Sequence, residues 1–125
     1  MTDGLIAAMI PRLFAPLTRE LRPERVEPVL AVMRSTSPRT IAASLRGMAA
    51  RPDRTAVLAK AAFPVLLVAG KHDVAVHFED AVRQAALPPV GAALFLEGSG
   101  HLAYLEQPEP TRRAMLALAA AVFGR

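Results

Sequence analysis

The fold is decided by the stretch FPVLLVAG at residues 63–70, a continuous apolar run that ends in glycine. Apolar residues in unbroken succession, without polar alternation, are typical of a parallel strand buried on both faces. A second run of this kind, AALFL, occupies residues 92–96. Between the two runs, residues 78–86 favour a helix that Pro88 and Pro89 stop. We therefore predict two strands, 63–69 and 92–96, joined by a crossover helix.

Two strands joined in this way must be parallel, and such crossovers are nearly always right-handed. The carboxyl ends of both strands then face the same edge of the sheet. Because ligands bind at that edge in open parallel sheets, polar residues just beyond the strands are the candidates for chemistry. These residues are Lys71, His72, Asp73, His77, Glu97, Ser99 and His101.

The first half of the chain shows helical spacing instead. A first helix is expected to kink or shorten at Pro11, and a second begins near Pro23. Ser37 is a good N-cap for a third helix, and Asp53 can cap a short fourth one. We therefore predict a helical segment at residues 1–58, followed by an α/β unit at residues 59–125.

The last helix is expected to run from Pro108 to Phe123 with a broad apolar face. Glu106 and Pro108 are expected to start this helix, and Gly124 suits its C-terminal end. Tyr104 is expected to pack beside the pocket at the sheet edge. The fold class predicted from these elements is α/β, with a two-stranded parallel β-α-β-α unit.

The amino-acid composition excludes several classes of protein and several kinds of site. The 125 residues are 53% hydrophobic and 21% charged, as in a small globular domain. The absence of cysteine excludes disulfides, thiolate nucleophiles and cysteine-based zinc sites. The longest charge-free apolar run, at 114–123, is half of the roughly 20 residues that a membrane helix needs. We therefore expect no membrane segment. The N-terminus also lacks the positive start of a secretory signal, and we expect a cytoplasmic location.

The net charge of +4 does not predict nucleic-acid binding. The basic excess lies within residues 1–60, where the arginines are spaced singly and only Phe14 is interleaved among them. A groove that follows phosphates and stacks bases requires clustered cations with aromatic platforms. A solvated helical surface is the better interpretation, and we expect no nucleic-acid partner.

Two motifs follow the predicted strands. The first is Gly70-Lys71-His72-Asp73, and the second is GSGH at residues 98–101, followed by Glu106 and Pro108. A strand with Gly-x-x-Asp, then about 25 to 30 residues later Gly-x-Gly-His-x-x-x-x-Glu-x-Pro and a final helix, resembles the end of many α/β-hydrolases. In that fold the triad order is Ser, then Asp or Glu, then His.

The resemblance covers the whole chain and is most specific in its second half. It implies that Asp73 is the triad acid and His101 the general base. It also implies that residues 1–58 correspond to a helical cap and residues 59–125 to the C-terminal part of the hydrolase core. Small carboxylesterases and lactonases look most similar, which implies a small ester or lactone substrate and no cofactor.

The chemistry of acyl transfer explains this pair of residues. A serine hydroxyl is a poor nucleophile until an imidazole accepts its proton, and a carboxylate on the other nitrogen fixes the tautomer. We therefore expect the Asp73 carboxylate to meet Nδ1 of His101. Gly98 and Gly100 are expected to provide unusual dihedrals for the turn before His101. The family often has a proline soon after the acid, whereas Asp73 is followed by Val-Ala-Val.

The nucleophile is not found in this sequence. None of its four serines stands in Gly-x-Ser-x-Gly; they are Ser35, Ser37, Ser44 and Ser99. In the family, the donors to the oxyanion also come from segments that precede the matched region. The chain is expected to be inactive alone. It is either a C-terminal hydrolase segment, a non-catalytic truncated remnant, or one half of a split hydrolase that another chain completes.

Simpler interpretations exist for the same residues. Asp73 can form a turn, and His101 can be a loop histidine bonded to backbone; His72 and His77 are taken as loop residues. A metal site formed by these four residues is chemically feasible, but no ligand spacing is diagnostic, so we predict none.

The strand at 63–69 is expected to have an unpaired edge. In the family this strand lies between the strand at 92–96 and another strand, for which residues 1–62 show no candidate. An apolar edge without charges or bulges is a template for association, and a two-stranded sheet is marginal by itself. We expect the chain to be oligomeric, aggregated or molten, with this edge pairing with a second copy or a complementing chain.

Overall fold

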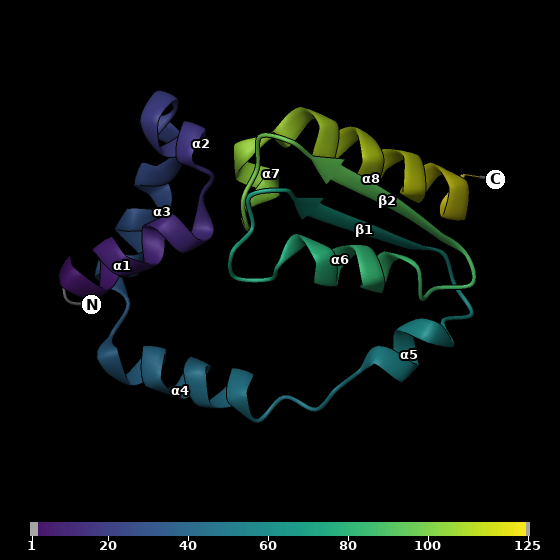
Figure 1. Cartoon of the computed structure of the whole chain (residues 1–125), viewed down its shortest axis with the longest axis horizontal. Coiled ribbons are helices and arrows are strands. Elements are labelled where there is room, and N and C mark those ends of the chain that lie inside the picture. The colour runs from purple at the N-terminus through teal and green to yellow at the C-terminus, as the bar shows by residue number, and fades with distance from the viewer. Residues whose placement is uncertain (1–2, 125) are drawn as a thin grey trace.

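The computed structural model describes residues 3–124 (Figure 1). Helices come first, and a strand–helix–strand–helix unit follows. The elements are α1 (Asp3–Leu13), α2 (Pro16–Leu21), α3 (Pro23–Ser35), α4 (Pro38–Ala49), α5 (Thr55–Ala59), β1 (Val65–Gly70), α6 (Phe78–Ala85), β2 (Gly91–Leu96), α7 (Ala103–Glu106) and α8 (Pro108–Phe123). The predicted α/β class is confirmed.

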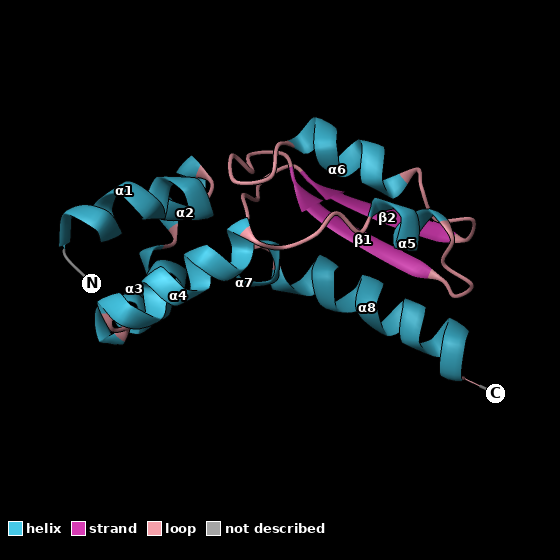
Figure 2. Ribbon diagram, turned by 90° about the horizontal axis from the view of Figure 1, so that it is seen from below, coloured by secondary structure: helices cyan, strands magenta, loops and turns pink. Residues whose placement is uncertain are grey.

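The sheet consists of the two predicted strands, which are parallel and in register from Val65 opposite Gly91 to Gly70 opposite Leu96. Helix α6 covers one face of the sheet and α8 the other, which makes three layers (Figure 2). The rings of Phe78 and Phe95 meet edge to face, with their centroids 5.0 Å apart, and this contact joins α6 to β2.

The strand boundaries differ slightly from the prediction, because β1 begins at Val65 rather than residue 63 and includes Gly70. Gly70 belongs to the strand because it pairs with Leu96, and the loop after β2 lies directly against it. A Cβ atom at Gly70 would overlap the carbonyl oxygens of Ser99 and Gly100. The two loops at the carboxyl edge of the sheet can therefore approach closely only because residue 70 is glycine.

The expected shortening of the first helix at Pro11 is not observed. Helix α1 continues to Leu13, and the amide of Phe14 still donates to the carbonyl of Ile10 at 3.1 Å. Pro11 lies in the last turn, where its missing N–H removes a single helical bond at the end of the element. The short helices α2 and α7 were not predicted, since six and four residues are too few to show a clear period.

Of the two predicted caps in the helical segment, Ser37 is confirmed, whereas the N-cap position of α5 is Arg54 rather than Asp53. The Ser37 hydroxyl accepts from the Thr40 amide at 3.1 Å and caps α4. The Asp53 carboxylate accepts from the Thr55 amide at 2.8 Å at the start of α5. A side-chain cap therefore marks the start of α4, as the sequence predicts, while Asp53 bonds to the first amide of α5 from one position before its N-cap.

The buried side chains of the helical segment lie on α1 to α3 and at the α1–α2 corner, which is formed by Phe14 and Ala15 between the two helices. Helices α4 and α5 bury none, and α4 stands away from the sheet (Figure 1). The apolar face of α8 is also largely uncovered, and Thr111 is the buried residue of that helix. No helix within residues 3–124 is long and apolar enough to cross a membrane.

Candidate active site

The Asp73 and His101 side chains meet at the carboxyl edge of the sheet. Asp73 follows β1 and His101 follows β2, and Nδ1 of His101 lies 2.8 Å from Oδ2 of Asp73. Since an ionised carboxylate only accepts, the imidazole donates through Nδ1–H. The predicted contact between the two side chains is confirmed. The carboxylate side chain is 10% exposed and the imidazole 38%, so the acid is sheltered while the histidine faces outward.

The Asp73 carboxylate is held in place by its own loop. Its Oδ1 atom accepts from the Ala75 amide at 2.8 Å and from the Val76 amide at 2.9 Å. A proline at either position would remove one of these donors. The Val-Ala-Val sequence, which departs from the family pattern, therefore fixes the acid through hydrogen bonds and leaves Oδ2 free for the imidazole.

The loop that carries His101 is packed between β1 and the α1–α2 corner. Its main chain reaches both sides: Ser99 O accepts from the His72 amide at 2.9 Å, and the amides of His101 and Leu102 donate to Leu13 O. Ser99 is fully buried, and its hydroxyl donates to Gln107 Oε1 at 2.9 Å. The loop therefore has hydrogen-bonded partners in both halves of the chain.

The expected role of Gly98 and Gly100 needs correction. No described glycine has a positive φ, so the turn before His101 does not use dihedrals reserved for glycine. Gly100 is required for another reason, because a Cβ atom there would lie 2.9 Å from the Ala15 nitrogen and 3.0 Å from the Phe14 carbonyl carbon. The missing side chain lets the loop contact the α1–α2 corner.

Glu106 is the residue whose role sequence reasoning missed. It does not start the final helix: it ends α7, while α8 begins at Pro108. Its side chain is buried, with 3% of the residue exposed, and its carboxylate accepts from the amides of Ala15 and Gly100, each at 2.7 Å. A single acid among Leu102, Ala103 and Leu105 was the available sign that this carboxylate is buried.

A cavity of about 480 Å³ adjoins the Asp73 side of the pair. The α1–α2 corner lines one wall and the loop after β1 the other. Lys71 forms an ion pair with Glu97, and its ammonium lies 5.9 Å from the centre of the Phe78 ring. Tyr104 does not pack beside this cavity as expected, because it is 59% exposed and is not among the lining residues.

Within the described residues, the other polar side chains singled out in the sequence add neither a metal site nor a hydrogen-bonded serine to the Asp73–His101 pair. Within residues 3–124, no group of three or more histidines, aspartates or glutamates is arranged to hold a metal ion. His72 and His77 line the cavity beside Asp73, and His77 precedes α6. None of the serine hydroxyls in the described chain is hydrogen-bonded to His101; those of Ser35 and Ser99 donate to other partners.

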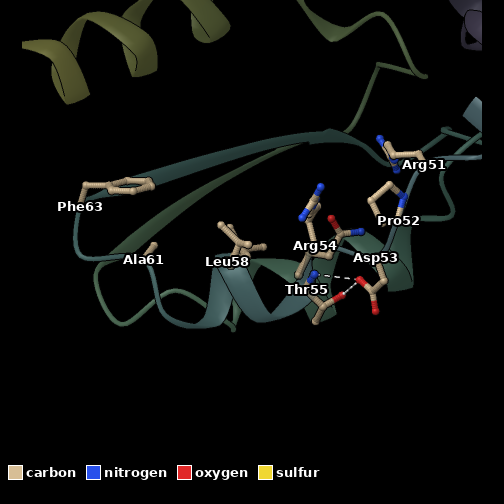
Figure 3. Close-up of a pocket in the computed structure, with 10 residues that line it drawn as sticks. Arg51, Pro52, Asp53, Arg54, Thr55, Leu58, Ala61 and Phe63 are labelled. Atoms are coloured by element: carbon tan, nitrogen blue, oxygen red, sulfur yellow. Dashed lines mark hydrogen bonds between the residues drawn. The ribbon is translucent and has the colours of Figure 1, made fainter. Parts of the chain in front are cut away.

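A larger cavity of about 590 Å³ is lined by residues of α5 and of the segments on either side of it (Figure 3). Its lining includes Arg51, Arg54 and Phe63, and neither Asp73 nor His101 contributes to it. The Asp53 carboxylate in this cavity accepts from the hydroxyl and amide of Thr55, and these bonds lower its pKa. The larger of these two cavities therefore lies apart from the hydrogen-bonded Asp73–His101 pair.

Comparison with known proteins yields structural matches. No family model matches the chain, and no curated protein sequence matches it significantly. A thermophilic esterase from Thermogutta terrifontis, solved with malate bound, is 31% identical with a TM-score of 0.89 over 96% of this chain and 44% of the esterase. An N-acyl homoserine lactone degrading enzyme is 21% identical, with a TM-score of 0.69 over 91% of this chain and 46% of that enzyme.

The chain thus spans less than half the length of each of these two proteins. The likeness confirms the predicted fold class, a part of the α/β-hydrolase fold, with neighbours of the esterase and lactonase type.

Proposed function

We propose that this chain supplies the acid and the base of a Ser–His–Asp triad in an acyl hydrolase that acts on small esters or lactones. The observation that carries the proposal is the 2.8 Å hydrogen bond between Asp73 Oδ2 and His101 Nδ1. With Nδ1 engaged, Nε2 is the imidazole nitrogen left to accept a proton. The esterase and lactonase neighbours support the reaction class.

In the proposed reaction, Nε2 of His101 accepts the proton of a serine hydroxyl as the oxygen attacks the substrate carbonyl. Asp73 holds the imidazole in the required tautomer and stabilises the imidazolium that forms. The imidazolium then gives its proton to the departing alkoxide, and an acyl-serine remains. Water, deprotonated by the same nitrogen, releases the acid and regenerates the serine.

The nucleophile and the oxyanion donors come, in this proposal, from residues outside the 125-residue sequence. The described serine hydroxyls do not contact His101, and the chain corresponds to only 44% of the matching esterase. Residues 1–58 act as the helical cap, and their α1–α2 corner lines the cavity beside Asp73. Residues 59–125 provide the last part of the core. The reaction requires no cofactor.

A chimera tests this proposal directly. The chain replaces the aligned segment of the Thermogutta terrifontis esterase, whose remaining part supplies the rest of the active site. We expect hydrolysis of p-nitrophenyl butyrate, and we expect His101→Ala and Asp73→Asn to reduce kcat about 10⁴-fold. A folded chimera that retains its activity in either variant contradicts the proposal. The control is Glu109→Gln, which changes an exposed carboxylate of α8 outside this cavity and should leave kcat within about threefold.

The chain without a complement should be inactive. General-base assistance without a nucleophile or an oxyanion site lacks the largest contributions to catalysis. We expect turnover of p-nitrophenyl acetate no faster than with free imidazole, and no serine labelled by a fluorophosphonate. Turnover well above this level that disappears in His101→Ala would overturn the assignment of the nucleophile to another segment.

The proposed complement includes a strand that pairs with the outer edge of β1. The described sheet has two strands, so β1 has a partner along one edge, and apolar side chains of α8 such as Met115 and Phe123 are exposed. A second copy is the alternative partner. Sedimentation velocity of the purified chain should show oligomers or aggregates, whereas a monodisperse monomer with a cooperative melt contradicts this part of the proposal.

A further inference from the structure

Glu106 carries a buried carboxylate that the proposed triad does not use. Its two oxygens accept from main-chain amides, Oε2 from Ala15 and Oε1 from Gly100, each at 2.7 Å. The Arg25 guanidinium contacts the main-chain carbonyl of Glu106 rather than its carboxylate. The Glu106 carboxylate is therefore held by two oriented N–H groups, and hydrogen bonds to an ionised carboxylate are charge-assisted.

The two donors belong to different halves of the chain. Ala15 precedes the first residue of α2 and is almost fully buried, while Gly100 immediately precedes His101. The sequence separation between Ala15 and Glu106 is 91 residues. One side chain thus links the α1–α2 corner to the loop of the proposed base, beside the direct bonds from His101 and Leu102 to Leu13 O.

A carboxylate suits this position because it presents two acceptor oxygens. A glutamine of nearly the same shape has one acceptor oxygen and one NH₂ group. In Glu106→Gln, the amide of either Ala15 or Gly100 would face a donor. Both amides lie within hydrogen-bonding distance of a buried side chain, where an unpaired donor is costly.

We propose that Glu106 is a positioning residue, which holds the His101 loop against the α1–α2 corner and thereby orients the imidazole toward Asp73. It does not touch the reacting atoms. Its importance for catalysis rests on the proposed function, whereas its effect on the imidazole does not. The helical segment is thereby coupled to the base through this buried carboxylate, in addition to the main-chain bonds to Leu13 O.

The test compares the chimera that carries the wild-type chain with the same chimera bearing Glu106→Gln, Asp73→Asn or Thr111→Val. Thr111 is the matched control: it is buried nearby and bonds to the carbonyls of Ala103 and Gln107, but not to the His101 loop or α2. Imidazole ¹⁵N shifts report the tautomer of His101, which is assigned through His101→Gln. Hydrogen exchange reports the amides of Ala15 and Gly100.

We expect Glu106→Gln to raise exchange at Ala15 and Gly100 by roughly tenfold or more relative to the amides of α8. The Nδ1–H tautomer of His101 should be lost toward the level of Asp73→Asn, and Thr111→Val should retain it. In the chimera, kcat should fall at least about tenfold while KM changes less than about threefold.

Three outcomes overturn the positioning role: unchanged exchange in Glu106→Gln, changed exchange with an unchanged tautomer, or an equal loss of the tautomer in Thr111→Val. If Glu106→Gln does not fold, the exchange rates of the wild-type amides test the positioning role instead. Ala15 and Gly100 donate to the same carboxylate, so their amides should be protected to a similar degree. A difference above about 100-fold overturns the link. An unchanged His101 tautomer in Asp73→Asn instead counts against the proposed function and leaves the result at Ala15 and Gly100 interpretable.

Discussion

Helices α1 to α3 and helices α4 to α5 belong to the same segment but differ in how they are held. The first group buries apolar side chains, among them Ile6, Val26 and Met33, and its α1–α2 corner is bonded to the His101 loop. The second group buries no side chain, although α4 has the clearer sequence signals, a serine cap and an apolar stripe. Long-range contacts, rather than local helix signals, therefore decide which helices are anchored.

This difference has a functional consequence. The anchored corner is the part of the helical segment that lines the cavity beside Asp73 and reaches the proposed base. Helix α4 contributes no residue to that cavity. Residues that shape the proposed site should therefore be sought near Phe14 to Arg19 before α4.

The largest expected effect is the removal of an anchor. Phe14 is 1% exposed at the α1–α2 corner, and Phe14→Ala should lower the free energy of unfolding by about 3–5 kcal/mol. The control is Met48→Ala on α4, which is 65% exposed and should stay within about 0.5 kcal/mol. Urea unfolding of the chimera, followed by circular dichroism, measures both. Similar losses in the two variants would show that α4 is anchored after all.

A pair of glycine substitutions should have opposite signs. Gly70→Ala places a Cβ atom against the carbonyl oxygens of the His101 loop and should destabilise the chain by about 1–3 kcal/mol. Gly47→Ala meets no atom within 4 Å inside α4 and should stabilise by about 0.5–1 kcal/mol. Thermal unfolding compares the two. A destabilised Gly47→Ala would mean that a surface of α4 is covered in solution.

Loss of the α4 cap should have a local effect. Ser37→Ala removes the acceptor of the Thr40 amide and should cost about 1 kcal/mol of helix stability. Because α4 has no buried side chain, the loss should appear as faster amide exchange confined to α4, with the Gly100 amide unchanged. Faster exchange at Gly100 as well would show that α4 and the proposed site are coupled.

The smallest expected effect depends on pH. The Thr55 hydroxyl and amide lower the folded pKa of Asp53 below its ordinary 3.8, so this interaction stabilises α5 above pH 3.8. The contribution is lost as the pH falls below 3.8 through the lowered folded value. Protection of the Thr55 amide should fall over this range in the wild type, and Asp53→Asn should not show the same titration. An identical pH profile in both would contradict the assignment to Asp53.

The predicted strands, their parallel order and the meeting of Asp73 with His101 followed from sequence because each depends on local pattern and simple topology. Unbroken apolar runs indicate buried strands, and a single crossover helix leaves few arrangements. Both strands then end at one edge, so the residues that follow them must be neighbours. The cap at Ser37 and the bond from Thr55 to Asp53 were predictable for the same reason, since the partners lie within three residues.

Only the tertiary structure decided the features that depend on distant partners. Burial of Glu106 requires Ala15, 91 residues away, and the need for glycine at positions 70 and 100 arises from the packing of one loop against another. Helix α7 is too short for its pattern to be visible in sequence. Sequence alone determined the strands, the longer helices and the meeting of Asp73 with His101, because local pattern and simple topology encode them. The support of the His101 loop was decided by packing, because hydrogen bonds and close approaches between remote segments have no local pattern.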